Sequence, residues 1–166
     1  LGQFREKPEP IAAMNLSINL ANDFQPQAHD VEIKVIVDNS SFQRVFGEKR
    51  LAIEKNLVAQ AMSNILENAV KYADPGTTVT VSGHGDDKSV GIVIESIGIP
   101  VSEEEKHHLF ERGYRGRAAM QKVAAGTGIG LYLASRVMTF HGGRIDVENR
   151  DKLSRFSLMF PRGCLK

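Results

Sequence analysis

The sequence is poor in cysteine, lacks tryptophan and contains no long apolar run. Cys164 is the only cysteine in 166 residues, which excludes a disulfide framework and fits a reducing compartment. No apolar stretch approaches the roughly 20 residues that a transmembrane helix needs, and no signal peptide is evident. We therefore expect a cytoplasmic domain without direct membrane contact. Because the chain begins at Leu1 and not at a methionine, we expect a longer parent protein, which can itself be membrane-anchored.

Charge of one sign is not in excess either, since the formal net charge is only +1. The total charge therefore indicates no polyanionic partner. Basic residues are not gathered with aromatic ones, so we expect no nucleic-acid partner. The five histidines and the acidic residues are scattered, which argues against a metal site built from them. Any site for a phosphorylated ligand has to come from a local arrangement of side chains and backbone amides.

The chain length suits one domain. Residues 1–10 carry charges and two prolines and look like the end of a linker, which leaves residues 11–166 as the domain. Apolar spacing predicts helices over residues 11–24, 54–72 and 128–140, the first ending at Pro26, and a short helix after Ser102. Alternation predicts a strand over residues 31–37. Further strands are predicted over residues 77–82, 89–95, 144–148 and 153–160, with a short strand over 42–46 and a loop over 112–125. This mixture predicts an α+β layered domain.

A polar stripe runs along the predicted helix over residues 54–72. Asn64, Glu67, Asn68 and Lys71 fall within an arc of roughly 100°, opposite a wide apolar face. Asparagine is a poor helix former, so two of them four residues apart suggest that their amide oxygens have a role. Neutral oxygens suit Mg²⁺, the ammonium suits phosphate, and the carboxylate can accept a proton. The alternative is an ordinary exposed face that contains two asparagines by chance.

A glycine-rich segment, Gly126-Thr127-Gly128-Ile129-Gly130-Leu131, opens the predicted helix that ends at residue 140. Free backbone amides at the start of a helix bind phosphate, and glycine allows close approach. A dinucleotide-binding fingerprint is excluded, because its third glycine falls on Leu131 and no strand precedes Gly126. The alternative is a hinge and helix cap without a ligand.

Together these segments resemble the sequence boxes of the GHKL ATPase superfamily and, within it, the catalytic domains of sensor histidine kinases. The boxes stand in the family's order: Asn64-Ile65-Leu66-Glu67-Asn68-Ala69-Val70-Lys71-Tyr72, Leu109-Phe110-Glu111-Arg112-Gly113-Tyr114-Arg115, the glycine segment from Gly126 to Leu131, and His141-Gly142-Gly143. The ending Lys71-Tyr72 is typical of kinases and not of gyrase-like members. The resemblance covers nearly everything from Ile11 to Pro161.

The resemblance implies a Bergerat-type two-layer α/β sandwich, with a mixed, mostly antiparallel sheet and helices on one face. It implies ATP and Mg²⁺ as cofactors, with Asn68 supplying an oxygen to Mg²⁺ and Glu67 polarising the attacking group. It also implies nucleotide contacts by Asn64, Lys71, Tyr72, Tyr114 and Arg115, and by the amides of the segment Gly126, Thr127, Gly128, Ile129, Gly130 and Leu131.

One box departs from the family pattern. The family's first glycine box reads Asp-x-Gly-x-Gly, and its aspartate accepts a hydrogen bond from the adenine amino group. When Gly98 is aligned with the first glycine, Ser96 takes the aspartate position and Pro100 the second glycine. Strand alternation is expected to point the neighbouring Glu95 to the other face of the sheet. We therefore expect Ser96 and Gly98 in the ATP site, with a weaker contact to the base.

The implied function is transfer of the terminal phosphoryl group of ATP to a histidine on a separate dimerisation domain. The implied partners are that phosphoacceptor domain and a cognate response regulator. None of the five histidines has the setting of a phosphoacceptor, so the fragment alone is not expected to phosphorylate itself. The alternatives are a degenerate pseudokinase or interaction module with weak nucleotide binding, a serine kinase of the anti-sigma type, and an ATP-hydrolysing machine such as gyrase or the heat-shock chaperone.

Overall fold

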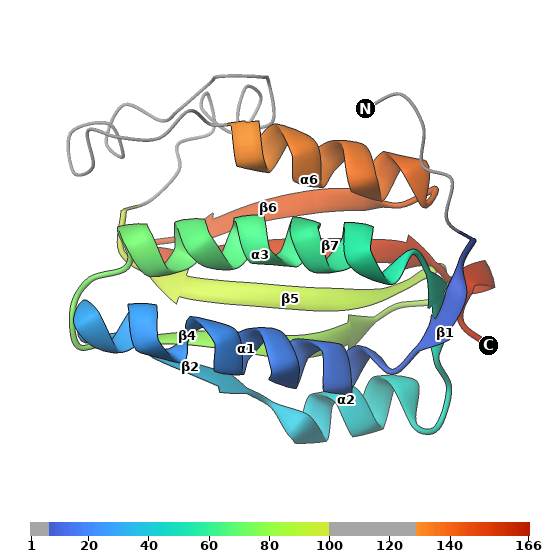
Figure 1. Ribbon diagram of the computed structural model, residues 1–166, viewed down its shortest axis with the longest axis horizontal. Coiled ribbons are helices and arrows are strands. Elements are labelled where there is room, and N and C mark those ends of the chain that lie inside the picture. Colours follow the sequence, from blue (N-terminus) through green and yellow to red (C-terminus); the bar gives the residue numbers. More distant parts are fainter. Residues whose placement is uncertain (1–6, 100–128) are drawn as a thin grey trace.

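Within the described residues, 7–99 and 129–166 of a computed structural model, five strands form one mixed sheet in the order β2-β4-β5-β7-β6 (Figure 1). β2 and β4 are parallel, and all other neighbours are antiparallel. The strands are β2 (Lys34–Val37), β4 (Thr78–Gly85), β5 (Ser89–Ile97), β6 (Arg144–Arg150) and β7 (Leu153–Pro161). The predicted mixed, mostly antiparallel sheet is confirmed.

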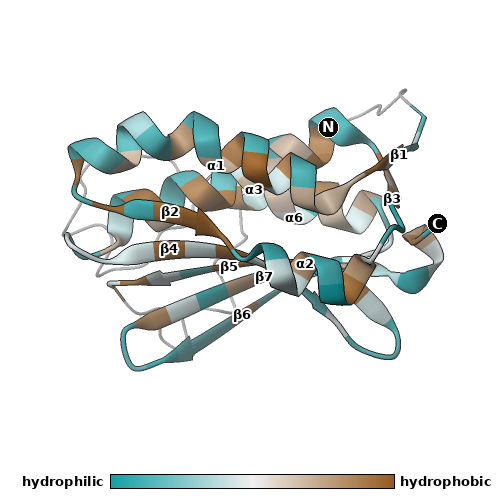
Figure 2. Ribbon diagram, turned by 90° about the horizontal axis from the view of Figure 1, so that it is seen from below, coloured by the Kyte–Doolittle hydropathy of each residue, from teal (hydrophilic) through white to brown (hydrophobic). Residues whose placement is uncertain are grey.

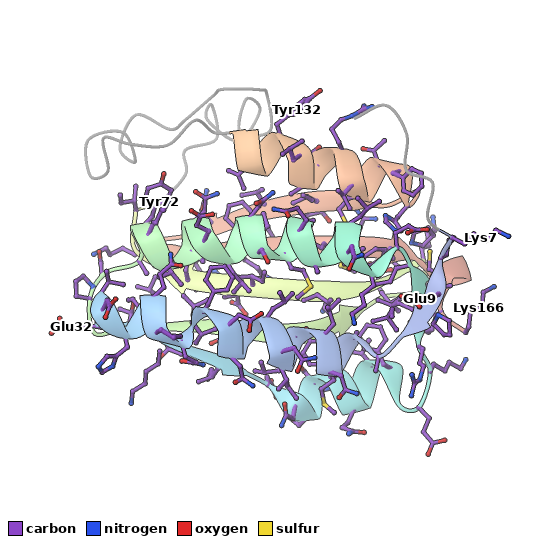
Figure 3. All side chains as sticks on the ribbon, viewed as in Figure 1. Lys7, Glu9, Glu32, Tyr72, Tyr132 and Lys166 are labelled. Carbon is purple, nitrogen blue, oxygen red and sulfur yellow. The ribbon has the colours of Figure 1, made fainter. Side chains whose placement is uncertain are left out.

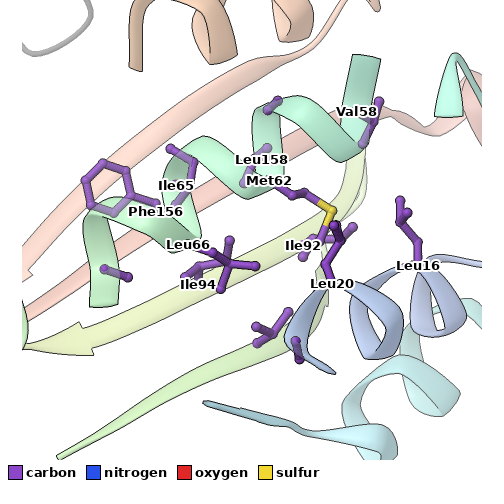
Figure 4. Close-up of a cluster of buried hydrophobic side chains, with 14 of the residues drawn as sticks. Leu16, Leu20, Val58, Met62, Ile65, Leu66, Ile92, Ile94, Phe156 and Leu158 are labelled. Atoms are coloured by element: carbon purple, nitrogen blue, oxygen red, sulfur yellow. The ribbon is translucent and has the colours of Figure 1, made fainter. Parts of the chain in front are cut away.

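Three helices cover one face of this sheet: α1 (Ala13–Asp30), α3 (Lys55–Tyr72) and α6 (Ile129–Phe140) (Figure 2). The central helix, α3, buries its apolar face on the middle strands. Figure 4 shows Met62, Ile65 and Leu66 of α3 over Ile92 and Ile94 of β5. Each of these side chains is at most 1% exposed, and burying one is worth about 1.5–3 kcal/mol. The two-layer α/β sandwich is therefore confirmed, and its core fixes α3 over the centre of the sheet.

The prediction of a strand over residues 42–46 was wrong, because these residues belong to helix α2 (Asn39–Phe46). Asp38 caps this helix by accepting hydrogen bonds at Oδ1 from Ser40 Oγ (2.7 Å) and Ser41 N (3.2 Å). These two bonds lower the pKa of the Asp38 carboxyl. Phe42 and Phe46 stand four residues apart and stack on each other with ring centroids 6.0 Å apart, which is helical and not strand spacing.

Helix α1 does not end at Pro26 as predicted but continues to Asp30. Proline removes one hydrogen bond and crowds the preceding turn, but Pro26 lies on the exposed side, where water can bond the freed carbonyl. Beyond it, Ala28 is fully buried and Gln25 Nε2 donates to Val35 O of β2 at 2.7 Å. These contacts hold the last helical turn in place. The next strand therefore begins at Lys34 and not at Val31, which is 44% exposed at the helix end.

A second, two-stranded sheet pairs β1 (Glu9–Ile11) with β3 (Leu51–Ile53). Neither strand was predicted, and the linker predicted over residues 1–10 overlaps β1 by two residues. A short 3₁₀ helix, η1 (Arg162–Cys164), follows β7, and Leu165 bridges back to Leu51. The beginning and the end of the described chain are thus tied to the same short strand.

His141 joins the end of α6 to the start of α3. Its Nε2 accepts a hydrogen bond from the backbone N–H of Glu54 (3.1 Å), and its Nδ1–H donates to Val137 O (2.8 Å). This pair of bonds requires a neutral imidazole with the proton on Nδ1. Burial lowers the pKa of His141, partly offset by the bond to Val137. The box His141-Gly142-Gly143 therefore has a structural role in holding two helices together.

We expect the stability of the fold to fall when His141 is protonated. Because its pKa is lower in the folded than in the unfolded chain, its contribution is complete above the ordinary value of about 6.5 and is lost as the pH falls below it. Urea unfolding between about pH 8 and pH 5 is the measurement, with His141→Gln expected to show a flatter pH dependence. His29→Gln removes an exposed histidine and is the control. Equal pH profiles for the protein and His141→Gln would contradict this prediction.

Candidate functional site

The candidate site lies at one end of the sandwich, where α3 ends, α6 begins and β5 ends (left in Figure 1). α3 and α6 pack side by side and run in opposite directions, so the end of one meets the start of the other. Figure 3 labels Tyr72 at this end of α3 and Tyr132 on the first turns of α6. A separate cleft of about 350 Å³ lies between the start of α1 and α2, and none of the predicted site residues lines it.

Asn64 links the two helices at the site. Its Nδ2 donates to Gly130 O at 2.9 Å, and its Oδ1 accepts from Gln60 Nε2 at 3.1 Å. Gly130 is close to Asn64, since a Cβ at this position would lie 3.4 Å from the Asn64 amide carbon. Asn64 therefore positions the first turn of α6 as it is described, the part of the glycine-rich segment for which the sequence predicts phosphate contacts. Leu131 follows with its side chain buried in the core.

Asn68 has its amide oriented by the helix itself. Its Nδ2 donates to the backbone oxygen of Asn64 at 3.2 Å. Among residues 7–99 and 129–166, no donor is bonded to its Oδ1, and the side chain is half-buried. The amide nitrogen is therefore anchored, while the amide oxygen is presented beside the polar stripe as a neutral, hard ligand.

Glu67 and Lys71 complete the polar stripe and bind each other. Lys71 Nζ lies 2.8 Å from Glu67 Oε1, and the two side chains are 37% and 49% exposed. Such an exposed pair adds little to stability. The stripe therefore brings together one carboxylate, one ammonium and the amide of Asn68 on the exposed side of α3, as the sequence predicts.

The end of β5 is clamped between α3 and the turn that joins β6 to β7. Ile97 O accepts from Asp74 N (2.8 Å), and Gly98 N donates to Lys152 O (2.9 Å). Ile99 N donates to Tyr72 O (3.3 Å), and the side chains of Lys152 and Asp74 form an ion pair over this junction. The predicted site residues Tyr72 and Gly98 are thus held in backbone contact with each other.

Ser96 lies just before this clamp and, by alternation from the buried Ile94, on the helix-covered face of β5. Glu95 lies on the opposite face, opposite Arg155 of β7. The partner of Ser96 in β7 is Ser154, and the partner of Ser154 in β6 is Asn149. Ser154 is 5% exposed, and its Oγ bonds Asn149 Oδ1 at 3.2 Å.

Sequence reasoning identified Ser96 but missed Ser154, Asn149 and Lys152. A signal for Ser154 was present, because a serine occupies the inward position of β7 just before the apolar series of Phe156, Leu158 and Phe160. The cross-strand register that places it beside Ser96 depends on pairing between distant segments. That register is not visible in the local pattern.

Several predicted site residues lie outside the described residues. They are Tyr114, Arg115, Gly126, Thr127 and Gly128, together with the short helix after Ser102 and the loop over residues 112–125. Ile129 is the first residue of α6 as described. The predictions for the masked residues stay predictions.

Among residues 7–99 and 129–166, no group of three or more histidine, cysteine, aspartate or glutamate side chains is arranged to hold a metal ion. None of the helices described there is both long and apolar enough to cross a membrane.

Comparison with known proteins finds a matching family model and similar curated proteins. The family model described as "Histidine kinase-, DNA gyrase B-, and HSP90-like ATPase" matches residues 53–163. The chain is 35% identical over 109 residues to the probable sensor kinase SilS of Salmonella typhimurium, and the matched part is 66% of this chain and 22% of SilS. The chain thus spans less than a quarter of the length of this relative.

Solved structures show the same fold. The mycobacterial sensor histidine kinase MprB matches with a TM-score of 0.74 and 24% identity, covering 92% of this chain and 97% of that one. Full-length ShkA, solved in complex with AMPPNP, matches with a TM-score of 0.76 and 20% identity, covering 93% of this chain and 31% of that one.

Proposed function

The chain belongs to the family of histidine kinase-, DNA gyrase B- and HSP90-like ATPases, and on this basis we propose that it is the ATP-binding catalytic domain of a sensor histidine kinase. It transfers the terminal phosphoryl group of ATP to a histidine on a separate dimerisation domain. Relatives such as SilS are sensor kinases several times longer than this chain, which supports a parent protein that contains that domain. A cognate response regulator is the proposed downstream partner, and the parent is proposed to be membrane-anchored.

The main support for this proposal is the orientation of the Asn68 amide, whose Nδ2 is hydrogen-bonded while no described donor bonds its Oδ1. Mg²⁺ prefers oxygen ligands, keeps several waters and is commonly held by only one or two protein groups together with substrate phosphates. Asn68 offers such an oxygen from a side chain whose nitrogen is already anchored on Asn64. The residues present therefore fit the metal. Bound there, Mg²⁺ neutralises charge on the phosphates of ATP.

Each neighbouring group has a proposed part in phosphoryl transfer. Lys71 exchanges its bond to Glu67 for one to a phosphate, and Glu67 is then available to accept the proton from the N–H of the imidazole whose other nitrogen attacks. The new bond joins that imidazole nitrogen to the γ-phosphorus, while the bond to the β–γ bridging oxygen breaks and ADP leaves with its electron pair. The amides at the start of α6 hold the polyphosphate, and Tyr72 packs near the base.

The sequence-predicted lid completes the proposed site. Tyr114 and Arg115 reach the nucleotide from the lid, with Arg115 steadying the terminal phosphate. The amides from Gly126 to Gly130 are proposed to contact the phosphates. These contacts rest on the family resemblance, because residues 100–128 lie outside the described part.

Calorimetric titration of the chain with the ATP analogue AMPPNP and Mg²⁺ tests the proposal. We expect saturable binding that Ser96→Asp tightens by about tenfold, since a hydrogen bond to a charged group contributes about 1.5–3 kcal/mol. Ser157→Ala, on the same sheet but on the opposite face, is the control and is expected to leave affinity unchanged. Absence of binding at millimolar nucleotide in both the protein and Ser96→Asp would exclude the kinase and leave an interaction module.

A phosphotransfer assay tests the second half of the proposal. The chain is mixed with radiolabelled ATP and the separately expressed phosphoacceptor domain of its parent. Labelled phosphate is expected on that domain, stable to base and labile to acid as a phosphohistidine is. Label that resists acid would indicate a serine kinase instead.

A further inference from the structure

Three amide side chains lie on successive turns of α3, at positions 60, 64 and 68. Residues four apart in a helix are neighbours on one face, and here they bond to each other. Gln60 Nε2 donates to Asn64 Oδ1 at 3.1 Å, and Asn68 Nδ2 donates to Asn64 O at 3.2 Å. Gln60 lies one turn before the box that begins at Asn64, so the family resemblance assigns it no role.

The start of α6 is bonded to this face of α3 through Asn64. Asn64 Nδ2 donates to Gly130 O at 2.9 Å. At the opposite end of α6, His141 Nε2 accepts from Glu54 N at 3.1 Å. The two helices are therefore hydrogen-bonded at both ends of α6, and the bond at the candidate site depends on how the Asn64 amide is turned.

The orientation of both amides follows from the backbone carbonyl of Gly130. A carbonyl oxygen only accepts hydrogen bonds, so Asn64 has to turn its Nδ2 toward Gly130 and its Oδ1 away from it. That Oδ1 then faces Gln60, which donates to it through Nε2. With Asn64 turned the other way, two oxygens would face each other at Gly130. Gln60 therefore supports the one orientation of Asn64 that holds α6.

The bond between Gln60 and Asn64 lies at the surface, since Gln60 is exposed and Asn64 is half-buried. Because water competes for both groups, this bond contributes little to the stability of the fold. Its effect is on the order of the site before a ligand binds. A first turn of α6 that is already held in place does not have to be ordered on binding, and this raises the affinity.

We propose that Gln60 is a positioning residue of the nucleotide site, which acts through Asn64 to hold the first turn of α6 for the phosphates of ATP. This inference rests on the proposed function, which assigns the polyphosphate to the glycine-rich segment at the start of α6. In this role Gln60 itself does not contact the nucleotide.

The experiment is a calorimetric titration of the protein and its variants with AMPPNP and Mg²⁺. Gln60→Met keeps a long neutral side chain but removes the donor, and it should weaken binding by about two- to tenfold. Gln60→Lys keeps a donor within reach of Asn64 and should bind at least as tightly as the unchanged protein. Asn56→Lys adds the same charge one turn earlier on α3 and shows what a cation alone contributes. Gln27→Met, at an exposed glutamine of α1, is the matched control.

A double-mutant cycle tests whether Gln60 acts through Asn64. Asn64→Ala should itself weaken binding, and adding Gln60→Met to it should have no further effect. An equal loss from Gln60→Met in the presence and absence of the Asn64 side chain would overturn the inference. So would a Gln60→Lys variant that binds as weakly as Gln60→Met.

The outcomes separate this inference from the proposed function. If the unchanged protein binds AMPPNP and Gln60→Met binds it equally well, the inference is overturned while the proposed function stands. If the unchanged protein binds no AMPPNP, the proposed function fails and the inference fails with it. Gln60→Met should unfold at the same temperature as the unchanged protein, because the bond that it removes is exposed. A clearly lower melting temperature would attribute the loss of binding to misfolding and would also overturn the inference.

Discussion

Asn68→Ala is expected to lose most Mg²⁺-dependent nucleotide binding while keeping its fold. The variant removes the amide oxygen that Asn68 presents to a hard cation. Losing a hydrogen-bonding or metal-ligating group opposite a charged ligand weakens binding by about ten- to a hundredfold. Titration of AMPPNP with Mg²⁺, and again with the metal chelated, is the measurement. With the metal chelated, the variant and the unchanged protein should bind AMPPNP with the same affinity. With Mg²⁺ present, the variant should bind it more weakly.

Thermal unfolding distinguishes a specific loss of nucleotide binding in Asn68→Ala from misfolding. Among the described residues, Asn68 bonds only to the turn before it, and alanine is the better helix former by up to about 0.7 kcal/mol. Asn68→Ala should therefore unfold at the same temperature as the protein or slightly above it. Asn56→Ala changes an exposed asparagine at the start of the same helix and should bind nucleotide normally. If Asn68→Ala binds nucleotide with Mg²⁺ as tightly as the unchanged protein, Asn68 is not a ligand of the metal.

Gly98→Ala is expected to be the most damaging single substitution at the site. A Cβ at this position would lie 2.2 Å from Tyr72 O and 2.9 Å from Ala73 Cα, and both are backbone atoms that no side-chain rotation can move. The end of β5 therefore has to shift away from α3. Overpacking of this kind costs about 1–3 kcal/mol, which lowers the melting temperature by about 2–4 °C per kcal/mol in a chain of this size.

Nucleotide binding should fall together with stability in Gly98→Ala, because Ser96 lies two residues before the displaced backbone. Gly163→Ala is the control, since a Cβ there meets no atom within 4 Å. Thermal unfolding and AMPPNP titration of both variants are the measurements. If Gly98→Ala melts and binds like Gly163→Ala, the clamp between β5 and α3 has no part in shaping the site.

The long helix and the sheet could be predicted because their patterns are strong. The apolar face of residues 54–72 is continuous, and the strands predicted over residues 77–82, 89–95, 144–148 and 153–160 are found as β4, β5, β6 and β7 with ends that differ by a few residues. The errors fell where local pattern and tertiary packing compete. Phe42 and Phe46 were assigned to a strand although the cap at Asp38 starts a helix, and Pro26 did not end α1 because the turn beyond it is held by the sheet.

The sequence by itself determined which residue types are available to the site, because the boxes around Asn68 and Gly130 are contiguous and their chemistry follows from residue type and helical spacing. Only the tertiary structure decided how they act together. Asn64 is committed to holding α6, Asn68 is left to offer its oxygen, and Ser154 and Asn149 lie in cross-strand register with Ser96. The physical reason is that helix spacing is a local property, whereas the register of strands from distant segments is set by packing of the whole core.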